Sequence, residues 1–285
     1  DQKALWRGDL DIQTSSVDPG LAQRLERFPG VRLLALPLLE SVICFMGSAN
    51  NNIKRNSQMI AAVCSHFQEN YLGSVGGTDF YAFPSLEQMS TLDEATLFEL
   101  GWGYRAPRFV KLCPELVALG GEQWLETLMG GGRDLAREKL CQLTGVGRKV
   151  ADCITLFSLC CDDCIPVRFA PTIKSVASQS PLACMVALLT TPTVECVSQI
   201  MAGQVDTHAW QFMQRAGYLP QLKKASGLTD ANYALIGETL RKRYGDRAGW
   251  AFIVLFVAEV RQFRCSSDRA LPWPPYATAP LAVLR

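Results

Sequence analysis

Apolar residues recur along most of the chain at three- and four-residue intervals, which is the spacing of one face of an α-helix. In residues 53–67, for example, Ile60, Val63 and Phe67 lie on one stripe. The same pattern predicts further helices over residues 21–28, 37–46, 105–119, 134–140, 148–159, 206–215, 230–244 and 247–263. No segment alternates apolar and polar residues strongly enough to predict a strand, so we expect an all-α fold.

Two segments interrupt this pattern. Residues 167–204 have no clear helical stripe and carry three charged residues, Arg168, Lys174 and Glu195, among Ser, Thr, Pro and small apolar residues. That is long for a connection inside a compact domain. Residues 264–285 contain four prolines without periodicity, and we expect them to form a loose tail.

Composition narrows the class of protein. The 285 residues are 48% hydrophobic and 19% charged, which predicts a folded chain with a core large enough for one or two domains. The longest apolar run, residues 250–258, is too short to span a bilayer, and no secretory signal is visible at the start.

The net charge of +1 predicts no polyanion partner by itself, so phosphate binding would need a local patch. Eleven cysteines in a chain this long indicate reduced thiols rather than a disulfide framework.

The segment 143–154 is the most informative one. Gly145 and Gly147 flank Val146, which predicts a tight turn between two helices with exposed N–H groups at the start of the second helix, a favourable place for phosphate. Lys149 and Cys153 then lie on one face of that helix. The positive end of the helix dipole disfavours a protonated Lys149, which would lower the pKa of its amine and suit a nucleophile. A plain turn followed by a solvated lysine explains these residues equally well.

The same segment resembles the helix–hairpin–helix of the eukaryotic 8-oxoguanine DNA glycosylases. Matching stretches occur in the family's order at residues 30–34, 48–53, 83–86, 100–105, 205–210, 248–251 and 254–256. The resemblance implies an all-α helix–hairpin–helix glycosylase fold whose N-terminal antiparallel sheet domain is absent or truncated. Residues 1–166, with the hairpin at about 135–160, and residues 205–263 would form the core.

The resemblance also implies a reaction. Lys149 would displace the base and form a Schiff base with the sugar, and Asp206 would supply the carboxylate that stabilises charge on the sugar. The protein would then be a bifunctional DNA glycosylase and apurinic lyase that acts on 8-oxoguanine opposite cytosine. From the residues alone, Asp206 is equally an N-cap for the helix that follows it.

Further roles follow from the same resemblance. Asn50, Tyr104, Arg55 and Arg105 would fill the space left by the flipped base and contact the orphaned cytosine. The asparagine run is otherwise typical of loops and helix caps. Cys153 and Phe256 would sandwich the flipped purine, although both could simply be core residues. The phosphate contacts would be Gly145, Gly147 and His208.

The sequence departs from the family in two places besides its start. Phe252 occupies the position where relatives carry a glutamine that reads the flipped base, and phenylalanine cannot make that contact. Residues 167–204 separate Pro166 from Val205, which adjoin in relatives. Val codons begin GT and a Gln codon is CAG, so we hypothesise that this segment is a translated intron.

Metal and partner predictions complete the picture. Cys161 and Cys164 have a CxxC spacing, but a zinc site or iron–sulfur cluster needs four suitable ligands, so we expect no metal and no cofactor. We expect a monomer that binds damaged double-stranded DNA in the nucleus, with the mitochondrion as the alternative. A glycosylase for alkylated bases and a non-catalytic DNA-binding remnant remain the competing functions.

Overall fold

The computed structural model describes residue 21, residue 33, residues 35–166 and residues 230–259. The helices are α3 (Leu38–Gly47), α4 (Ile53–His66), α5 (Leu86–Ser90), α6 (Glu94–Glu99), α7 (Ala106–Leu119), α8 (Gly121–Glu126), α9 (Gly132–Leu140), α10 (Arg148–Phe157), α14 (Asp230–Tyr244) and α15 (Ala248–Glu259). Two short strands, β1 (Tyr71–Val75) and β2 (Thr78–Tyr81), pair as an antiparallel hairpin.

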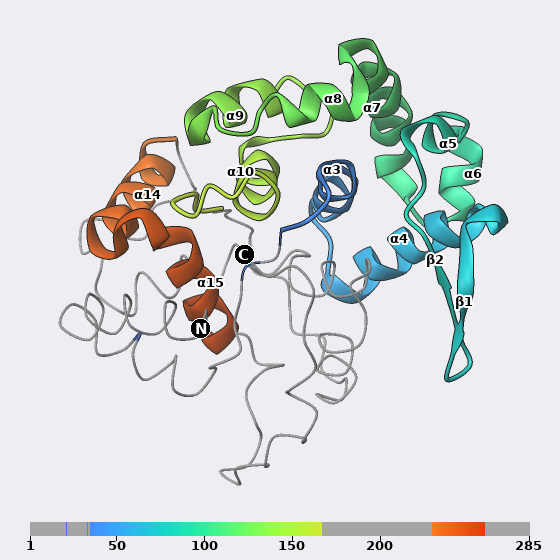
Figure 1. Cartoon of the computed structure of the whole chain (residues 1–285), viewed down its shortest axis with the longest axis horizontal. Coiled ribbons are helices and arrows are strands. Elements are labelled where there is room, and N and C mark those ends of the chain that lie inside the picture. The colour runs from blue at the N-terminus through green and yellow to red at the C-terminus, as the bar shows by residue number, and fades with distance from the viewer. Residues whose placement is uncertain (1–20, 22–32, 34, 167–229, 260–285) are drawn as a thin grey trace, which may run out of the picture.

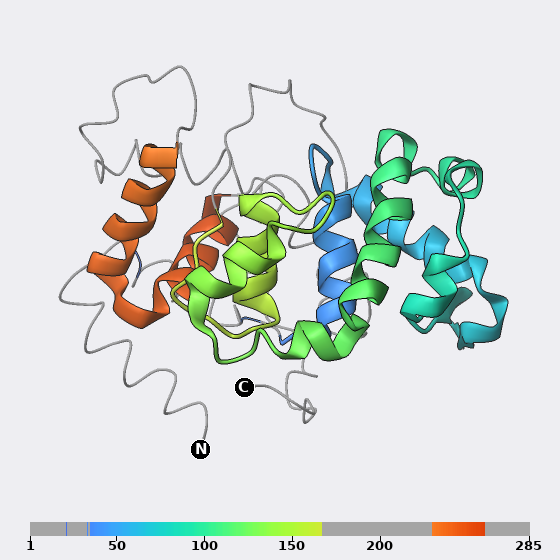
Figure 2. The same cartoon turned by 90° about the horizontal axis from the view of Figure 1, so that it is seen from above.

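Helices α3 and α10 lie side by side at the middle of the described part, with α7, α8 and α9 arching over them (Figure 1). The rings of Phe45 and Phe157 join the two central helices at a centroid distance of 5.8 Å. Helices α4 to α6 and the hairpin lie on one side, and α14 and α15 lie on the other, as Figure 2 also shows. The central pair therefore connects both halves of the core.

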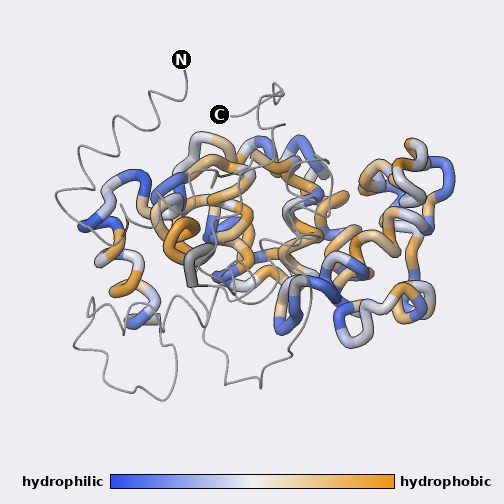
Figure 3. The backbone as a smooth tube through the Cα atoms, turned by 90° about the horizontal axis from the view of Figure 1, so that it is seen from below, coloured by the Kyte–Doolittle hydropathy of each residue, from blue (hydrophilic) through white to orange (hydrophobic). Residues whose placement is uncertain are grey.

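The sequence explains why α3 takes the central place. From Leu39 to Gly47 every residue of α3 is buried, which suits a helix with apolar residues on all sides. Hydrophobic segments gather toward the middle of the molecule in Figure 3, and hydrophilic ones lie at turns and helix ends. No helix within the described ranges has both the length and the apolarity needed to cross a bilayer.

Helix ends are marked by local signals. Asn52 accepts a hydrogen bond from the backbone N–H of Arg55 at the start of α4, and Asp93 does the same for Thr96 at the start of α6. Gly120 ends α7 with φ +107°, in the left-handed region that glycine adopts most easily.

The all-α prediction is confirmed for the described part, with two additions. The hairpin β1–β2 was not expected; both strands are largely exposed and therefore lack the alternation that marks a half-buried strand. The short helices α5, α6 and α8 were also not predicted, because five or six residues are too few to show a helical stripe. The expected helices at residues 21–28 and 206–215 lie largely or wholly outside the described residues, as do the segment 167–204 and the tail.

Candidate active site

The hairpin between α9 and α10 packs against two neighbouring helices, α7 and α3. The carboxylate of Glu115 on α7 accepts hydrogen bonds from the backbone N–H and the hydroxyl of Thr144, at 2.7 and 2.5 Å. Gly145 has φ +84°, and a Cβ built there would lie 2.9 Å from Met46 Cγ on α3. The turn therefore requires glycine at this position for both conformation and space.

Gly147 occupies the N-cap position of α10 and is exposed, with open space where a side chain would stand. Glycine has no side chain with which to cap this helix end. The first N–H groups of α10 therefore receive no side-chain cap from Gly147, which is the arrangement that suits an anion.

Lys149 is the second residue of α10, and it is not a solvated surface charge. Its residue exposure is 9%, and its Nζ donates a hydrogen bond to Ser48 Oγ at 3.4 Å. Ser48 follows directly after α3, so the contact joins two elements that are far apart in the sequence. A buried amine beside a hydroxyl has the environment of a reactive group rather than that of a solubilising one.

The loop after α3 presents Asn50 to solvent. Asn50 has φ +49° and is exposed, while its neighbours support the loop. Asn51 donates to the carbonyl of Gly47 at 3.0 Å, and Asn52 caps α4. Asn51 and Asn52 therefore have the ordinary loop and capping roles, and the exposed Asn50 is the asparagine left for a contact outside the loop.

Tyr104 and Arg105 hold this loop from the side. The Tyr104 hydroxyl donates to the carbonyl of Ala49 at 3.0 Å. The Arg105 guanidinium donates to the same carbonyl at 3.2 and 2.7 Å and to the carbonyl of Asn50 at 2.9 Å. Arg105 is 1% exposed, whereas Tyr104 is half exposed, and the centroid of its ring lies 4.3 Å from Cζ of the Arg105 guanidinium. The structure thus gathers Asn50, Tyr104 and Arg105, with the arginine turned inward.

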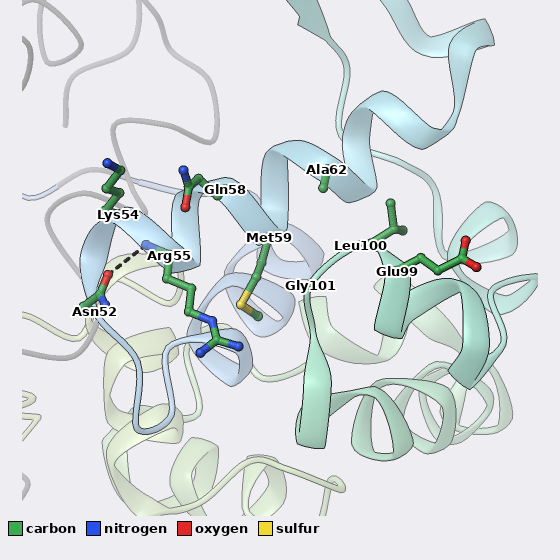
Figure 4. A pocket seen from close by; sticks show the side chains of 9 residues that line it. All are labelled: Asn52, Lys54, Arg55, Gln58, Met59, Ala62, Glu99, Leu100 and Gly101. Atoms are coloured by element: carbon green, nitrogen blue, oxygen red, sulfur yellow. Dashed lines mark hydrogen bonds between the residues drawn. The ribbon is translucent and has the colours of Figure 1, made fainter.

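Arg55 lies beside this group, on an open groove of about 590 Å³ between α4 and residues 99–101. In Figure 4, Arg55 and Met59 extend to one side of α4, and Lys54 and Gln58 extend to the other. The guanidinium of Arg55 lies near the backbone of Gly103, 3.8 Å from the position of an added Cβ. All four predicted wedge and orphan-base residues therefore cluster around one loop.

The predicted base pocket is only partly visible. Cys153 is fully buried on α10, and Phe252 is 3% exposed on α15. Gly249 at the start of α15 packs so closely that a Cβ would lie 2.3 Å from the carbonyl oxygen of Cys164. The side chain of Phe256 and the residues Asp206 and His208 lie outside the described part, so their roles stay predictions.

Sequence reasoning missed a buried carboxylate on α10. Asp152 is fully buried and accepts a hydrogen bond from Arg137 Nε at 2.6 Å, from the Tyr233 hydroxyl, and from Cys164 Sγ at 3.3 Å. These partners come from α9, α14 and the segment after α10. Only the burial of an acidic residue on the inner face of a predicted helix could have indicated it.

Within the described ranges, no group of three or more His, Cys, Asp and Glu side chains gathers as a metal site. No disulfide joins the eight cysteines of those ranges. The expectation that the protein needs no cofactor stays a prediction.

Two curated proteins of known name are similar in sequence to this chain. The chain is 33% identical over 248 residues to the N-glycosylase/DNA lyase OGG1 of Arabidopsis thaliana and 31% identical over 240 residues to an N-glycosylase/DNA lyase of Saccharomyces cerevisiae. These matches cover 86% and 81% of this chain, and the chain spans 56% and 57% of those relatives. No model of a known protein family matches.

Solved structures show the same fold. The 8-oxoguanine glycosylase/lyase of Clostridium acetobutylicum, in complex with double-stranded DNA containing cytosine opposite 8-oxoguanine, superposes with a TM-score of 0.63 at 21% identity, over 88% of this chain and 69% of that one. The chain is a homologue of the N-glycosylase/DNA lyases and has the helix–hairpin–helix glycosylase fold. A 3-methyladenine DNA glycosylase from Archaeoglobus fulgidus shares this fold, with a TM-score of 0.56 at 17% identity over 85% of this chain and 66% of that one. The fold of this glycosylase homologue therefore does not by itself select the damaged base.

Proposed function

We propose that this glycosylase homologue is a bifunctional DNA glycosylase and apurinic lyase that removes 8-oxoguanine opposite cytosine. The observation that carries the proposal is the buried amine of Lys149 at the start of α10, held beside the loop that presents Asn50. The names of the curated relatives, N-glycosylase/DNA lyase, support the same reaction class.

The chemistry begins when the damaged nucleotide leaves the duplex, because its glycosidic bond is unreachable in the stack. The neutral amine of Lys149 attacks C1′, and the base departs with the electron pair of the C1′–N bond and takes up a proton. Loss of a proton from nitrogen and opening of the sugar ring give a Schiff base. β-Elimination then breaks the C3′–O bond and cuts the strand. Asp206 is proposed to stabilise the positive charge that develops on the sugar.

Two groups of residues are proposed to bind the DNA. The turn with Gly145 and the exposed Gly147, together with His208, would bind the phosphates beside the lesion. Asn50 and Tyr104 would enter the duplex, and Arg55 and Arg105 would recognise the orphaned cytosine. We propose that the chain acts as a monomer in the nucleus.

Phe252 favours a second candidate for the damaged base. Its side chain is buried and apolar, so it offers no hydrogen bond to the Watson–Crick edge of 8-oxoguanine. An alkylated base, which is read more by shape and stacking, would suit such a pocket, with Cys153 and Phe256 as its proposed walls. Cleavage rates on matched duplexes that contain 8-oxoguanine or 3-methyladenine distinguish the two candidates.

The segment 167–204 is proposed to be a translated intron between the two parts of the core. A transcript in which Pro166 and Val205 are encoded side by side would support this proposal. A mature message that includes the whole segment would end it.

Borohydride trapping tests the central proposal. The protein is incubated with a duplex containing 8-oxoguanine opposite cytosine or an abasic site, and the Schiff base is reduced to a stable adduct. Lys149→Gln should abolish the adduct, because an amide cannot form a Schiff base. Lys139→Gln, in the other helix of the same hairpin, is the matched control and should retain it. DNA binding without any adduct in the unsubstituted protein would instead identify a non-catalytic remnant.

A further inference from the structure

We propose that Ser48 is a positioning residue for Lys149 that aims the amine at the sugar. This inference rests on the proposed function and adds a residue to its machinery. It starts from the hydrogen bond between Lys149 Nζ and Ser48 Oγ, at 3.4 Å, which lies in the buried interior between α3 and α10.

The Ser48 hydroxyl can act only as an acceptor for this amine. Its one proton is donated to the carbonyl of Phe45 at 2.6 Å, so the lone pairs of Oγ are what remain for Lys149. The amine must therefore point one of its N–H bonds toward Ser48. Because the nitrogen is tetrahedral, the lone pair of the neutral amine then takes one of the two remaining positions, both of which point away from Ser48 Oγ. Ser48 thus restricts the direction of the electron pair that forms the new bond.

The position of Ser48 is itself fixed from both sides. Its backbone N–H bonds the carbonyls of Cys44 and Phe45 at the end of α3, and its residue exposure is 0%. The two residues that follow it, Ala49 and Asn50, are held through their carbonyls by Arg105. The acceptor that orients the amine is therefore joined to the same loop that presents Asn50.

This arrangement connects two parts of the proposed reaction. Arg105 is proposed to contact the orphaned cytosine, and it reaches Ser48 through the backbone of two residues. A shift of Arg105 toward DNA would move the loop and with it the hydroxyl that orients Lys149. Through Ser48, the orientation of the Lys149 amine would therefore depend on the position of the loop after α3.

The test compares Ser48→Ala with Ser41→Ala. Ser41 lies on the same helix face two turns before Ser48, is equally buried, and its hydroxyl has no hydrogen-bond partner among the described residues. Each substitution removes one buried hydroxyl group, but only Ser48→Ala removes an acceptor from Lys149. Ser48→Thr keeps a hydroxyl at the position and is the conservative variant.

The measurement is the rate of borohydride trapping on an abasic-site duplex under single-turnover conditions, over a range of protein concentrations. Ser48→Ala should lower the rate at saturating protein about tenfold, which corresponds to the loss of one hydrogen bond. The half-saturating concentration should stay within about twofold, because DNA binding does not use this contact. Ser41→Ala should match the unsubstituted protein, and Ser48→Thr should recover most of the rate.

Each outcome decides something. If Ser48→Ala traps at the unsubstituted rate, the positioning role is wrong and the proposed function stands. If Ser41→Ala slows trapping as much as Ser48→Ala, the effect is one of core packing and the proposal is overturned. A folded Ser48→Thr protein that is as slow as Ser48→Ala would also count against it. If the unsubstituted protein forms no adduct, the proposed function fails and the role of Ser48 fails with it.

Discussion

Two regions of the core contain buried charges and stabilise them in different ways. On the inner face of α10, the carboxylate of Asp152 pairs with the guanidinium of Arg137 and also accepts from Tyr233 and Cys164. Burial opposes the charge on Arg137, but the hydrogen bond and the charge of Asp152 outweigh it and raise the pKa of the guanidinium above its usual value. In this region a cation and an anion meet directly.

Around α3 the buried charges are arranged otherwise. Arg105 donates to the backbone carbonyls of Ala49 and Asn50 after the end of the helix. Glu40, in the first turn of α3, is 8% exposed and makes no hydrogen bond to any residue of the described part. Burial raises the pKa of Glu40 to about 7. Glu40 therefore has no partner of the kind that Asp152 has among the described residues, and Arg105 is held in part by backbone oxygens.

The difference indicates that the α10 region stabilises the fold, whereas the α3 region can respond to DNA or to pH. The fully buried Asp152 pairs with Arg137, whose side chain is 21% exposed, and with the Tyr233 hydroxyl, so it joins α9, α10 and α14 and has its hydrogen bonds made within the fold. Carbonyl oxygens that hold Arg105 can be exchanged for acceptors on a base or a phosphate, and a carboxyl with a pKa near 7 changes charge near neutral pH. The α3 region, which leads to Ser48 and Asn50, is therefore where DNA or pH should act.

The largest expected effect is loss of the Asp152 carboxylate. Asp152→Ala leaves the buried Tyr233 hydroxyl without its acceptor, while Arg137, which is 21% exposed, keeps only its pair with Asp134. This should lower the free energy of unfolding by about 2–3 kcal/mol. The matched control is Asp163→Ala, which removes the partner of Arg133 from a pair whose side chains are 20% and 31% exposed. That change should cost about 0–1 kcal/mol.

Denaturant unfolding followed by circular dichroism measures both variants. Asp152→Asn, which keeps one acceptor oxygen, should fall between the two alanine variants. An Asp152→Ala protein as stable as Asp163→Ala would show that Asp152 does not hold α9, α10 and α14 together.

The next effect tests the hydrogen bonds by which Arg105 holds the loop that carries Asn50. Arg105→Lys keeps the charge but cannot donate to both carbonyls from a planar fork, which should cost about 1–3 kcal/mol of stability. Trapping on duplex DNA should fall by more than it does in Asp152→Asn, because the loop with Asn50 loses its support. Arg108→Lys, at an exposed position near the same tyrosine ring, is the control and should change stability by less than about 0.5 kcal/mol.

Comparing these two arginine variants sharpens the contrast between the regions. If Arg105→Lys lowered stability and left trapping untouched, the loop would be a purely structural element. If Arg108→Lys reduced trapping equally, the effect would come from replacing any guanidinium beside Tyr104 rather than from the hydrogen bonds of Arg105 to the loop.

Sequence periodicity was sufficient to predict most of the fold. The expected helix at residues 230–244 coincides with α14, and the one at 53–67 differs from α4 by one residue, because helical stripes and the Asn52 cap of α4 are local signals. The hairpin β1–β2 was missed although Gly76 and Gly77 are a typical turn pair between its strands. Its strands contribute little to the core and therefore carry little pattern.

The candidate site was predictable where it is local. Gly145, Gly147 and Lys149 lie within five residues of one another, and their types alone indicate a turn and a reactive amine. The contacts of Lys149 with Ser48 and of Asp152 with Arg137 and Tyr233 join residues of different helices. No spacing in the sequence encodes such pairs, since they depend on how the helices pack.

The smallest expected effect concerns Glu40. A carboxyl whose pKa is raised in the folded state binds its proton more tightly there than in the unfolded chain, so stability falls as pH rises from the unfolded pKa, near 4.5, toward about 7. Between about pH 5.5 and 7.5 this residue should lower the free energy of unfolding by about 1–2 kcal/mol. Glu40→Gln, which cannot ionise, should remove that part of the pH dependence and be the more stable protein at the higher pH.

Urea unfolding at the two pH values checks this expectation, with Glu69→Gln as the control. Glu69 is at the surface, and the pKa of its carboxyl is lowered by a hydrogen bond from its own backbone and by one from Gln88. Its replacement should therefore leave the loss of stability between the two pH values in place, because a group with a lowered pKa is already ionised throughout that range. If Glu40→Gln kept the full pH dependence, the titrating group would lie elsewhere, and the α3 region would resemble the α10 region in having its charge settled by the fold.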